Sequence, residues 1–454
     1  MTTDLELMAP VGSHESLAAA LQAGADSIYF GVTHLNMRAH SANTFTLDDL
    51  RHIAATCHAA GVRAYLTVNT VIYGDDLPLM RQVLDAAREA AIDAIIASDV
   101  AVMTYARAIG LEVHLSTQLN ISNVEALRFY AQFADVVVLA RELTLAQVSA
   151  IHQAIDADDI CGPSGRRVRI EMFCHGALCM AISGKCYLSA HCTGRSANRG
   201  ECMQLCRRRY RLIDDETGAE LVAEGRYLLS PKDLKTIDFL PQMVEAGVRV
   251  FKIEGRARGP EYVRTVVETY KAALAAAVPG SFPPGSPAAV PGAAVAAAAA
   301  VPGAAVAVPG AFPPGSSPGS SPGSPAGSPA AALATVFNRG FWDGYYLGAR
   351  VPELTPAPGS QATERKVYVG KGLKYYSRLG LGEFHIEAAP LRVGDRFLVT
   401  GPTTGAVYGT ITEMHDDSNA AVPVALQGQN VAFAVDAKVR PSDKLFKIVA
   451  PDEL

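Results

Sequence analysis

The chain has 454 residues, of which 49% are hydrophobic and 19% charged, and its formal net charge is −5. This composition can bury a large core and excludes wholesale disorder. The acidic balance excludes a globally basic nucleic-acid-binding protein, so any RNA contact must come from a local patch. No apolar run reaches the roughly 18 residues of a membrane span, and the first residues lack a basic, hydrophobic leader. We therefore expect a cytoplasmic protein of two or three domains that makes no membrane contact.

Eight short apolar runs alternate with amphipathic helical patterns in the first 277 residues. The runs are Leu5–Met8, Ser27–Phe30, Ala64–Val68, Ala94–Ala97, Val113–Leu115, Val136–Leu139, Val168–Phe173 and Val248–Ile253. The helical patterns are Glu15–Ala23, Leu47–Ala60, Pro78–Ala90, Ala101–Ile109, Val124–Gln132, Leu145–Ile155 and Pro260–Ala276. Alternating β and α units predict an α/β protein with a parallel sheet, and eight units predict a closed (β/α)8 TIM-like barrel. A doubly wound open sheet is the alternative, but it does not favour the number eight.

Changes in composition divide the chain into four parts. Residues 1–277 are predicted to form the barrel domain, which a cysteine-rich insertion interrupts at residues 174–247. Residues 278–332 are almost only Ala, Pro, Gly, Ser and Val and hold 13 of the 27 prolines, which predicts a disordered linker. Residues 333–362 form a connecting segment. Short alternating strands with turns such as Gly394-Asp395 then predict a small β-barrel domain over residues 363–454.

Six of the eight cysteines fall between Cys174 and Cys206. Clustered cysteines in a long chain from a reducing compartment indicate a metal site rather than disulfides. The candidate ligands are Cys179, Cys186, Cys202 and Cys206. Four thiolates can hold one [4Fe-4S] cluster or one zinc ion, and the wide first spacing favours the iron–sulfur cluster. Buried thiols without metal are the alternative, and we adopt that interpretation for Cys57 and Cys161.

Polar residues occupy inward-facing positions on several predicted strands. Because side chains alternate along a strand, Lys252 and Glu254 share the inward face, whereas Phe251 and Ile253 face the outer helices. The same alternation directs inward Tyr65, Thr67, Asn69, His114, Ser116, Gln118, Arg169, Glu171, Phe173 and His175. Barrel interiors are normally apolar, so polar groups that converge at the C-terminal ends of the strands predict a small-molecule or base pocket. An internal salt-bridge network such as Lys252–Glu171, without any ligand, is the alternative.

The segment from Gly165 to Arg211 carries ten Lys or Arg and two Glu, a local charge of +8. Arg207, Arg208 and Arg209 directly follow the last clustered cysteine. This segment can contact a phosphate backbone, or it can compensate the charge of an anionic thiolate cluster, and the two roles are compatible. Serine-hydrolase, zincin, P-loop and dinucleotide-binding motifs are missing from the sequence.

The stretch Glu171-Met-Phe-Cys-His-Gly-Ala-Leu-Cys-Met-Ala-Ile-Ser-Gly-Lys-Cys-Tyr-Leu-Ser189 resembles the signature of the peptidase U32, or collagenase-like, family. Further matches are Ala9-Pro10-Val11-Gly12, Gly24-Ala25-Asp26, Ser116-Thr117-Gln118, Arg141-Glu142-Leu143, Gly194–Gly200 and Lys252–Arg256. The resemblance implies a barrel-like fold with a [4Fe-4S] cluster, and the four candidate cysteines match its ligand positions. The residues 278–332, together with Cys174 and Cys192, depart from the family's pattern.

The resemblance also implies a class of activity. Some members of this family are required for oxygen-independent hydroxylation of the wobble uridine of tRNA, and others for that of a cytidine of 23S rRNA. These RNA-directed members depend on prephenate. Others act in ubiquinone synthesis, and these resemble the chain less. We therefore expect an iron–sulfur protein that forms 5-hydroxyuridine in tRNA, with 23S rRNA as the alternative substrate and with prephenate as a small carboxylate co-substrate.

This hypothesis assigns roles to residues at the barrel mouth. The expected catalytic residues are Glu171, His175, Lys252 and Glu254, and the expected substrate-binding residues are Asn69, Gln118, Arg141, Arg207 and Arg256. Carboxyl and imidazole groups would move protons, and basic groups would bind carboxylate or phosphate. The C-terminal domain is expected to hold the RNA. A collagenase-like, metal-dependent peptidase is the rival interpretation, and a protein that delivers RNA or an iron–sulfur partner to another enzyme is a third.

Overall fold

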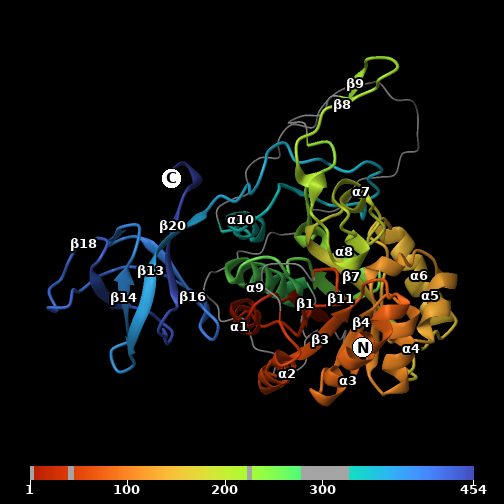
Figure 1. Cartoon of the computed structure of the whole chain (residues 1–454), viewed down its shortest axis with the longest axis horizontal. Coiled ribbons are helices and arrows are strands. Elements are labelled where there is room, and N and C mark those ends of the chain that lie inside the picture. Colours follow the sequence, from red (N-terminus) through yellow and green to blue (C-terminus); the bar gives the residue numbers. More distant parts are fainter. Residues whose placement is uncertain (1–4, 39–44, 222–226, 278–326, 454) are drawn as a thin grey trace.

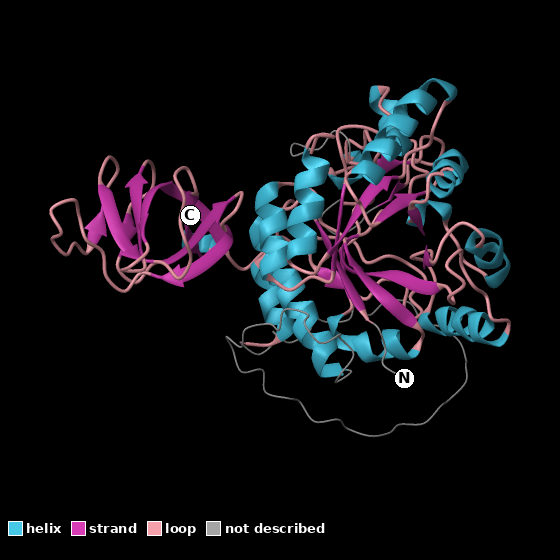
Figure 2. Ribbon diagram, turned by 90° about the horizontal axis from the view of Figure 1, so that it is seen from below, coloured by secondary structure: helices cyan, strands magenta, loops and turns pink. Residues whose placement is uncertain are grey.

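The computed structural model describes residues 5–38, 45–221, 227–277 and 327–453, and its largest element is a closed barrel of eight parallel strands (Figures 1 and 2). The strands are β1 (Glu6–Pro10), β2 (Ser27–Phe30), β3 (Arg63–Val68), β4 (Ala94–Ala97), β5 (Glu112–Leu115), β6 (Val136–Val138), β7 (Arg169–Ala177) and β11 (Val248–Ile253). Consecutive strands pair in parallel, and β11 pairs with both β7 and β1, which closes the sheet. The predicted (β/α)8 barrel is confirmed, and each predicted apolar run overlaps one of these strands.

Helices connect the strands and cover the outside of the barrel (Figure 2). They are α1 (His14–Gln22), α2 (Asp49–Ala59), α3 (Leu77–Glu89), α4 (Val100–Ala108), α5 (Val124–Ala131), α6 (Leu145–Ala157), α8 (Leu240–Glu245) and α9 (Pro260–Ala277). Single 3-10 turns occur at Gly74–Asp76, Thr117–Leu119, Ala197–Arg199, Leu205–Arg207, Ile237–Phe239 and Pro451–Glu453. Polar side chains cap the N-termini of several helices. The Ser13 hydroxyl accepts a hydrogen bond from the Ser16 amide at α1, and Thr144 and Gln147 form a capping box at α6.

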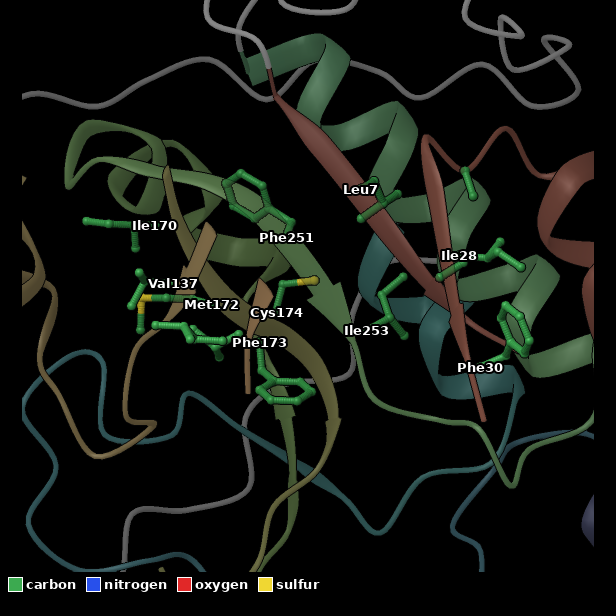
Figure 3. Close-up of a cluster of buried hydrophobic side chains, with 14 of the residues drawn as sticks. Leu7, Ile28, Phe30, Val137, Ile170, Met172, Phe173, Cys174, Phe251 and Ile253 are labelled. Carbon is green, nitrogen blue, oxygen red and sulfur yellow. The ribbon is translucent and has the colours of Figure 1, made fainter. Parts of the chain in front are cut away.

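The outward faces of the strands are apolar and pack against the helices. Figure 3 shows Leu7, Ile28, Val137, Ile170 and Phe251 in this layer, and each of them is almost completely buried. The arrangement follows from the period-two alternation of side chains along a strand. The prediction that the apolar face of the last barrel strand meets the helices is therefore confirmed.

The N-terminal end of the barrel interior holds an ion cluster instead of an apolar layer. Glu6 is 1% exposed and accepts hydrogen bonds from the Tyr65 hydroxyl at 2.8 Å and from Arg169 Nη1 at 3.0 Å. Arg63 pairs with the same carboxylate. Burial by itself would raise the pKa of Glu6, but the two guanidinium groups outweigh it and lower the pKa from 4.5 to about 2. A single buried carboxylate therefore stays ionised beneath the rest of the barrel interior.

The insertion after β7 extends the barrel sheet at one side. β10 (Asp233–Lys235) pairs antiparallel with β7, and β12 (Phe341–Trp342) pairs in parallel with β10. The Asp233 carboxylate lies 3.2 Å from Arg339 Nη1 and links β10 to the segment just before β12. The insertion also contains α7 (Leu188–Thr193) and a hairpin of β8 (Leu212–Ile213) and β9 (Glu220–Leu221). These strands were not predicted, because two or three residues are too few to show a period-two pattern.

The C-terminal part consists of antiparallel strands, as expected for a β domain, but within the described residues their pairing does not close into the small β-barrel that was predicted. Six strands pair in the order β17-β16-β20-β13-β14-β19, and β15 pairs with β18. Their bounds are β13 (Arg365–Tyr376), β14 (Leu381–Ile386), β15 (Leu391–Arg392), β16 (Arg396–Gly401), β17 (Gly405–Thr410), β18 (Val424–Ala425), β19 (Asn430–Ala434) and β20 (Lys444–Val449). The sheet has its own core, in which Phe433 contacts Phe384 and Phe397 with ring centroids 4.8 and 5.1 Å apart.

The predicted linker at residues 278–332 lies mostly outside the described residues. Its last residues differ from the prediction, because α10 (Pro329–Thr335) begins within it. The Ser328 hydroxyl accepts from the Ala331 amide, Pro329 occupies the first turn, and Leu333 is fully buried. In the ranges that the structure describes, no helix combines the length and the apolar character needed to cross a membrane.

The C-terminal sheet packs on the outer helices of the barrel (Figure 1). Ala19 of α1 shares a buried cluster with Leu398 and Ala406. Gln22 Nε2 donates to the Thr404 carbonyl at 2.8 Å. An ion pair of 2.8 Å also joins Lys366 of β13 to Glu261 of α9. The sheet is therefore attached to the barrel through α1 and α9.

We expect Glu6→Gln to make the stability of the fold less sensitive to acid. Because the pKa of Glu6 falls from 4.5 to about 2 on folding, its ionised form stabilises the native state above pH 4.5. This contribution of roughly 3 kcal/mol is lost as the pH falls from 4.5 to 2. Urea unfolding at pH 7 and pH 3 should show a larger loss of stability in the wild type than in the variant. Glu89→Gln, at a 70% exposed side chain, is the control. An equal loss in Glu6→Gln and wild type would contradict the prediction.

Candidate functional site

A cavity of about 130 Å³ lies at the C-terminal mouth of the barrel. Six of the residues predicted to form the site line it, namely Asn69, Gln118, Arg141, Lys252, Glu254 and Arg256. Three of the predicted metal ligands line the same cavity, namely Cys179, Cys186 and Cys202. The barrel brings them together because the C-terminal ends of all eight strands meet at this face, where the insertion after β7 also emerges. Their roles in binding or catalysis remain predictions.

A buried ion pair lies at the base of the cavity. Lys252 Nζ is 2.7 Å from Glu171 Oε1, and the two side chains are 6% and 0% exposed. The ammonium group also lies over the Tyr29 ring, 4.6 Å from its centroid. Lys252 lines the cavity, whereas Glu171 lies beneath it, and Glu171 Oε2 has no hydrogen-bond partner among the described residues. The predicted pair therefore exists, and its lysine faces the space that a ligand would occupy.

Glu254 is an ionised carboxylate in the wall of the cavity. Its Oε1 accepts from Arg38 Nη2 at 2.9 Å, and its Oε2 lies 3.3 Å from the Tyr29 hydroxyl. Burial raises the pKa of Glu254, but Arg38 outweighs it, with help from Arg256 and Arg141, and the pKa is lowered. A carboxyl group with a lowered pKa is a poor general acid at neutral pH. Glu254 is better suited to accept hydrogen bonds and to orient its cationic neighbours.

Two side-chain hydrogen bonds and close packing against two glycines hold Arg256 at the cavity. Its Nη1 donates to Thr67 Oγ1 at 2.7 Å and to Asn36 Oδ1 at 3.1 Å. A Cβ atom at Gly12 would lie 1.9 Å from the Arg256 carbonyl oxygen, so this position requires glycine, and a Cβ atom at Gly31 would lie 2.8 Å from Arg256 Nη1, so a larger residue there would displace that side chain. Burial lowers the pKa of Arg256 to about 10, which still leaves the group cationic at neutral pH.

Arg141 links the barrel to the predicted metal ligands. Its Nη2 donates to Ser183 Oγ at 2.6 Å, and it also hydrogen-bonds the Cys179 sulfur. Cys179 is an exposed residue, but its sulfur is largely surrounded by protein groups, and this desolvation raises its pKa. Arg141, together with Arg38 and Arg207, outweighs the desolvation, so the pKa of Cys179 is lowered. The lowered pKa of Cys179 therefore favours its thiolate form.

The fourth predicted ligand, Cys206, lies close to the other three but does not line the cavity. Burial raises the pKa of Cys206 against the effect of Arg207, and negative charge on Cys179, Cys186 or Cys202 raises it further. All eight cysteines are free thiols. The structure therefore brings the four predicted thiols into one electrostatic neighbourhood without any disulfide.

The donor atoms match a thiolate-bound metal centre, but their positions do not form one. Within the described part of the chain, no three His, Cys, Asp or Glu side chains are arranged to hold a metal ion. The sulfurs nonetheless share one neighbourhood with the guanidinium groups of Arg38, Arg141 and Arg207, which can balance the charge of a cluster and its thiolates. Binding would have to draw the four sulfurs together, and the [4Fe-4S] cluster remains a prediction, with zinc as its alternative.

The predicted inward orientation of His175 is wrong. A β-bulge between β7 and β11 leaves Cys174 as an extra residue, so the alternation of side chains shifts by one position beyond it. The His175 ring instead contacts Tyr262, Tyr270 and Phe341, and its Nδ1 lies 3.3 Å from the Tyr270 hydroxyl. Burial lowers the pKa of His175 to about 3. His175 is therefore a neutral, buried ring that does not line the cavity.

Arg207 also does not line the cavity, contrary to its predicted role in binding substrate. Its Nη1 donates to Ser230 Oγ at 3.0 Å and to the Pro231 carbonyl at 2.8 Å, and its Nη2 donates to the Leu178 carbonyl. These bonds tie the end of the cysteine-containing segment to the polypeptide on either side of it. Arg207 is therefore a positioning residue for the thiols.

Arg38 is a cavity residue that the sequence did not indicate. It follows β2 in a loop, outside any strand whose alternation could have placed it. Its importance arises only from the tertiary contact with Glu254, which raises the pKa of Arg38. Tyr29 was also missed, although its inward position on β2 follows from the same alternation that was applied to other strands.

A closed parallel barrel whose C-terminal mouth is lined by thiol, guanidinium and carboxylate groups defines a barrel protein with a polar ligand site. Peptidase family U32 matches residues 12–291, which include every residue of this cavity. The chain therefore belongs to peptidase family U32, as its motifs predicted.

Relatives of the chain carry two kinds of name. A protein named collagenase from Porphyromonas gingivalis is 55% identical over 450 residues, which are 99% of this chain and 99% of that protein. The 23S rRNA 5-hydroxycytidine C2501 synthase of Escherichia coli is 37% identical over 60% of this chain and 39% of that protein. The tRNA hydroxylation protein P1 of Bacillus subtilis is 35% identical over 61% of this chain and 64% of that protein. The relatives are thus named as a peptidase or as RNA-modifying proteins.

We expect Lys252→Met to lower the free energy of unfolding by roughly 3–5 kcal/mol, because it leaves the Glu171 carboxylate buried without its cation. The double variant Glu171→Leu/Lys252→Met should recover most of this loss, because both buried charges are then removed. Urea unfolding at pH 7 measures all three proteins. Lys444→Met, at an exposed position in the C-terminal sheet, is the control. If Lys252→Met were as stable as Lys444→Met, the ion pair would not contribute to the stability of the barrel.

Proposed function

We propose that the chain is an iron–sulfur protein for oxygen-independent RNA hydroxylation, with the wobble uridine of tRNA as its target and 5-hydroxyuridine as the product. The observation that carries the proposal is the meeting of four thiols with the cations of one polar cavity at the barrel mouth. The similarity to proteins named for tRNA hydroxylation and for 5-hydroxycytidine synthesis in 23S rRNA supports it. A cytidine of 23S rRNA is the alternative target.

In this proposal the thiolates of Cys179, Cys186, Cys202 and Cys206 hold the [4Fe-4S] cluster. When bound, such a cluster supplies one-electron transfer next to the cavity. Arg141 and Arg38 lower the pKa of Cys179 and so favour the thiolate form that metal binding requires. Arg207 keeps the segment that carries Cys206 in place through its bonds to three neighbouring groups.

The charge of the cavity suits a small anionic co-substrate. Four cations, Arg38, Arg141, Lys252 and Arg256, stand against two carboxylates, Glu171 and Glu254, which leaves an excess of two positive charges. A small carboxylate such as prephenate could pair with those cations that the thiolates do not balance. Arginine and lysine are the side chains that bind carboxylates most strongly, and a cavity of about 130 Å³ limits the ligand to a small one.

The polar side chains can be assigned separate tasks in the reaction. Arg256 and Arg141 bind the carboxylates, and Glu254 orients Arg38 and accepts hydrogen bonds. Lys252 Nζ faces the cavity and is the proton donor that we assign, while Glu171 holds it in position. The amides of Asn69 and Gln118, which hydrogen-bond one another at 3.2 Å, present donors and acceptors to a base edge.

Peptide hydrolysis is the second candidate function, because the relative named collagenase matches 99% of this chain. The cavity offers little support for it. No histidine lines the described cavity, and its one wall carboxylate, Glu254, is paired with Arg38. A metal-dependent peptidase needs a carboxylate or histidine that can activate water. We therefore rank RNA hydroxylation first.

Variants at the thiols test the proposal. We expect anaerobically purified wild-type protein to contain about four irons and four sulfides per chain, with visible absorption that a bound cluster gives. Cys186→Ala and Cys202→Ala should lose most of the iron and should fail to restore 5-hydroxyuridine in tRNA of a strain that lacks this modification. The matched control is Cys192→Ala, since Cys192 lies in the same segment but does not line the cavity.

Two results would contradict the proposal. Wild-type protein that contains about one zinc and no sulfide would exclude the iron–sulfur cluster. Cleavage of collagen peptides that is lost in Glu254→Gln, with no effect of the protein on RNA nucleosides, would establish the peptidase. Restoration of 5-hydroxycytidine in 23S rRNA instead of 5-hydroxyuridine would keep the chemistry and change the substrate.

A further inference from the structure

A second cavity, of about 430 Å³, adjoins the thiol-lined cavity, and we call it the side chamber. The residues that line both cavities are Met37, Asn69, Gln118, Gly184 and Cys186. The side chamber is otherwise lined by Val71, Ser98, Leu119, Tyr130, Lys185, Tyr187 and Asn198. It is about three times larger than its neighbour, and it reaches the candidate site through the shared wall.

Close contacts and hydrogen bonds fix the shared wall. Gly184 has φ +74°, and a Cβ atom there would lie 2.5 Å from Gln118 Cγ, so only glycine lets the two segments approach. Asn120 Nδ2 donates to the Gln118 carbonyl at 2.8 Å, and Asn69 Nδ2 donates to Gln118 Oε1 at 3.2 Å. The Asn69 carbonyl in turn accepts from Ser98 Oγ at 2.9 Å. The hydrogen-bonding groups of the wall are therefore pre-oriented.

The outer rim of the chamber is held in the same way. The Val71 amide donates to the Asn198 carbonyl at 3.2 Å, which joins the loop after β3 to the cysteine-containing segment. Next to this contact, Arg199 Nη2 donates to Asp76 Oδ1 at 2.9 Å, and the same guanidinium lies 4.7 Å from the centroid of the Tyr73 ring. The chamber is thus a preformed space between two segments far apart in the sequence.

The chamber combines three kinds of group that single-stranded RNA requires. Tyr130 and Tyr187 line it, and Tyr187 is 73% exposed, so its ring is accessible to a ligand. Lys185 is exposed and makes no ion pair with any carboxylate in the described chain. Amide and hydroxyl groups of the wall face the same space. Aromatic rings stack on bases, amides bond base edges, and lysine binds phosphate.

We propose that the side chamber binds one unpaired nucleobase of the substrate RNA, with the Tyr187 ring stacked on the base and Lys185 at the adjoining phosphate. This inference rests on the proposed function, because it takes RNA as the substrate. The amides of Asn69 and Gln118 contact the base edge at the shared wall. The base is thereby presented to the thiol-lined cavity, and that smaller space remains for the carboxylate co-substrate.

Binding of a fluorescently labelled, uridine-rich single-stranded RNA to the full-length protein, followed by anisotropy, tests the chamber. We expect Tyr187→Ala to weaken binding by roughly 5- to 150-fold, the range for loss of one stacked base. Tyr187→Phe keeps the ring and should bind like the wild type. Lys185→Ala should weaken binding and reduce its dependence on salt. The control is Tyr105→Ala, which removes a partly exposed ring of α4 that lines neither cavity and should leave RNA affinity unchanged.

A complementation assay with the same variants separates the two proposals. If the wild type restores the hydroxylated nucleoside but Tyr187→Ala binds RNA as tightly as the wild type, the side chamber is not a base site although the proposed function holds. If the wild type neither binds RNA nor restores the nucleoside, the proposed function itself fails. Loss of peptide cleavage in Tyr187→Ala, with RNA affinity unchanged, would make the chamber a peptide site and overturn the inference.

Discussion

The ion pair between Lys252 and Glu171 stands where a barrel of this type normally has a layer of branched apolar side chains. An unpaired charge at such a depth would cost several kcal/mol, so each charge in the interior needs a partner of opposite sign. Glu6, at the N-terminal end of the barrel, is paired with Arg63, and Glu254, at the mouth, is paired with Arg38. The interior also holds a buried apolar cluster that includes Met8, Ile96, Val136 and Val250, so it combines paired charges with apolar side chains beneath the cavity at its mouth.

The excess of cations at that open end relates the thiols to the rest of the site. Guanidinium groups lower the pKa of Cys179 and compensate the charge that a set of thiolates would carry. Two of these groups, those of Arg38 and Arg141, also line the cavity, where they could bind a small anion. A thiolate-bound cluster and a carboxylate co-substrate would thus depend on one set of arginines, which is why we propose that both belong to a single reaction rather than to separate sites.

The relatives with the two kinds of name match different shares of the chain. The protein named collagenase matches nearly all of it, whereas the proteins named for tRNA hydroxylation and for 5-hydroxycytidine synthesis match about three fifths. In the described chain, the residues that line the two cavities of the mouth come only from the barrel and its insertion. The C-terminal sheet instead contacts α1 and α9. Its expected role in holding RNA remains a prediction.

The sequence by itself determined the eight-stranded barrel, the apolar outer face of its strands and the polar residues at their C-terminal ends, because alternation along a strand is a local property. It also identified the cysteine group. Only the tertiary structure decided that His175 faces α9, because the bulge at Cys174 depends on the register between β7 and β11. The same holds for Arg38 and the side chamber, because both arise from contacts between loops that are distant in the sequence.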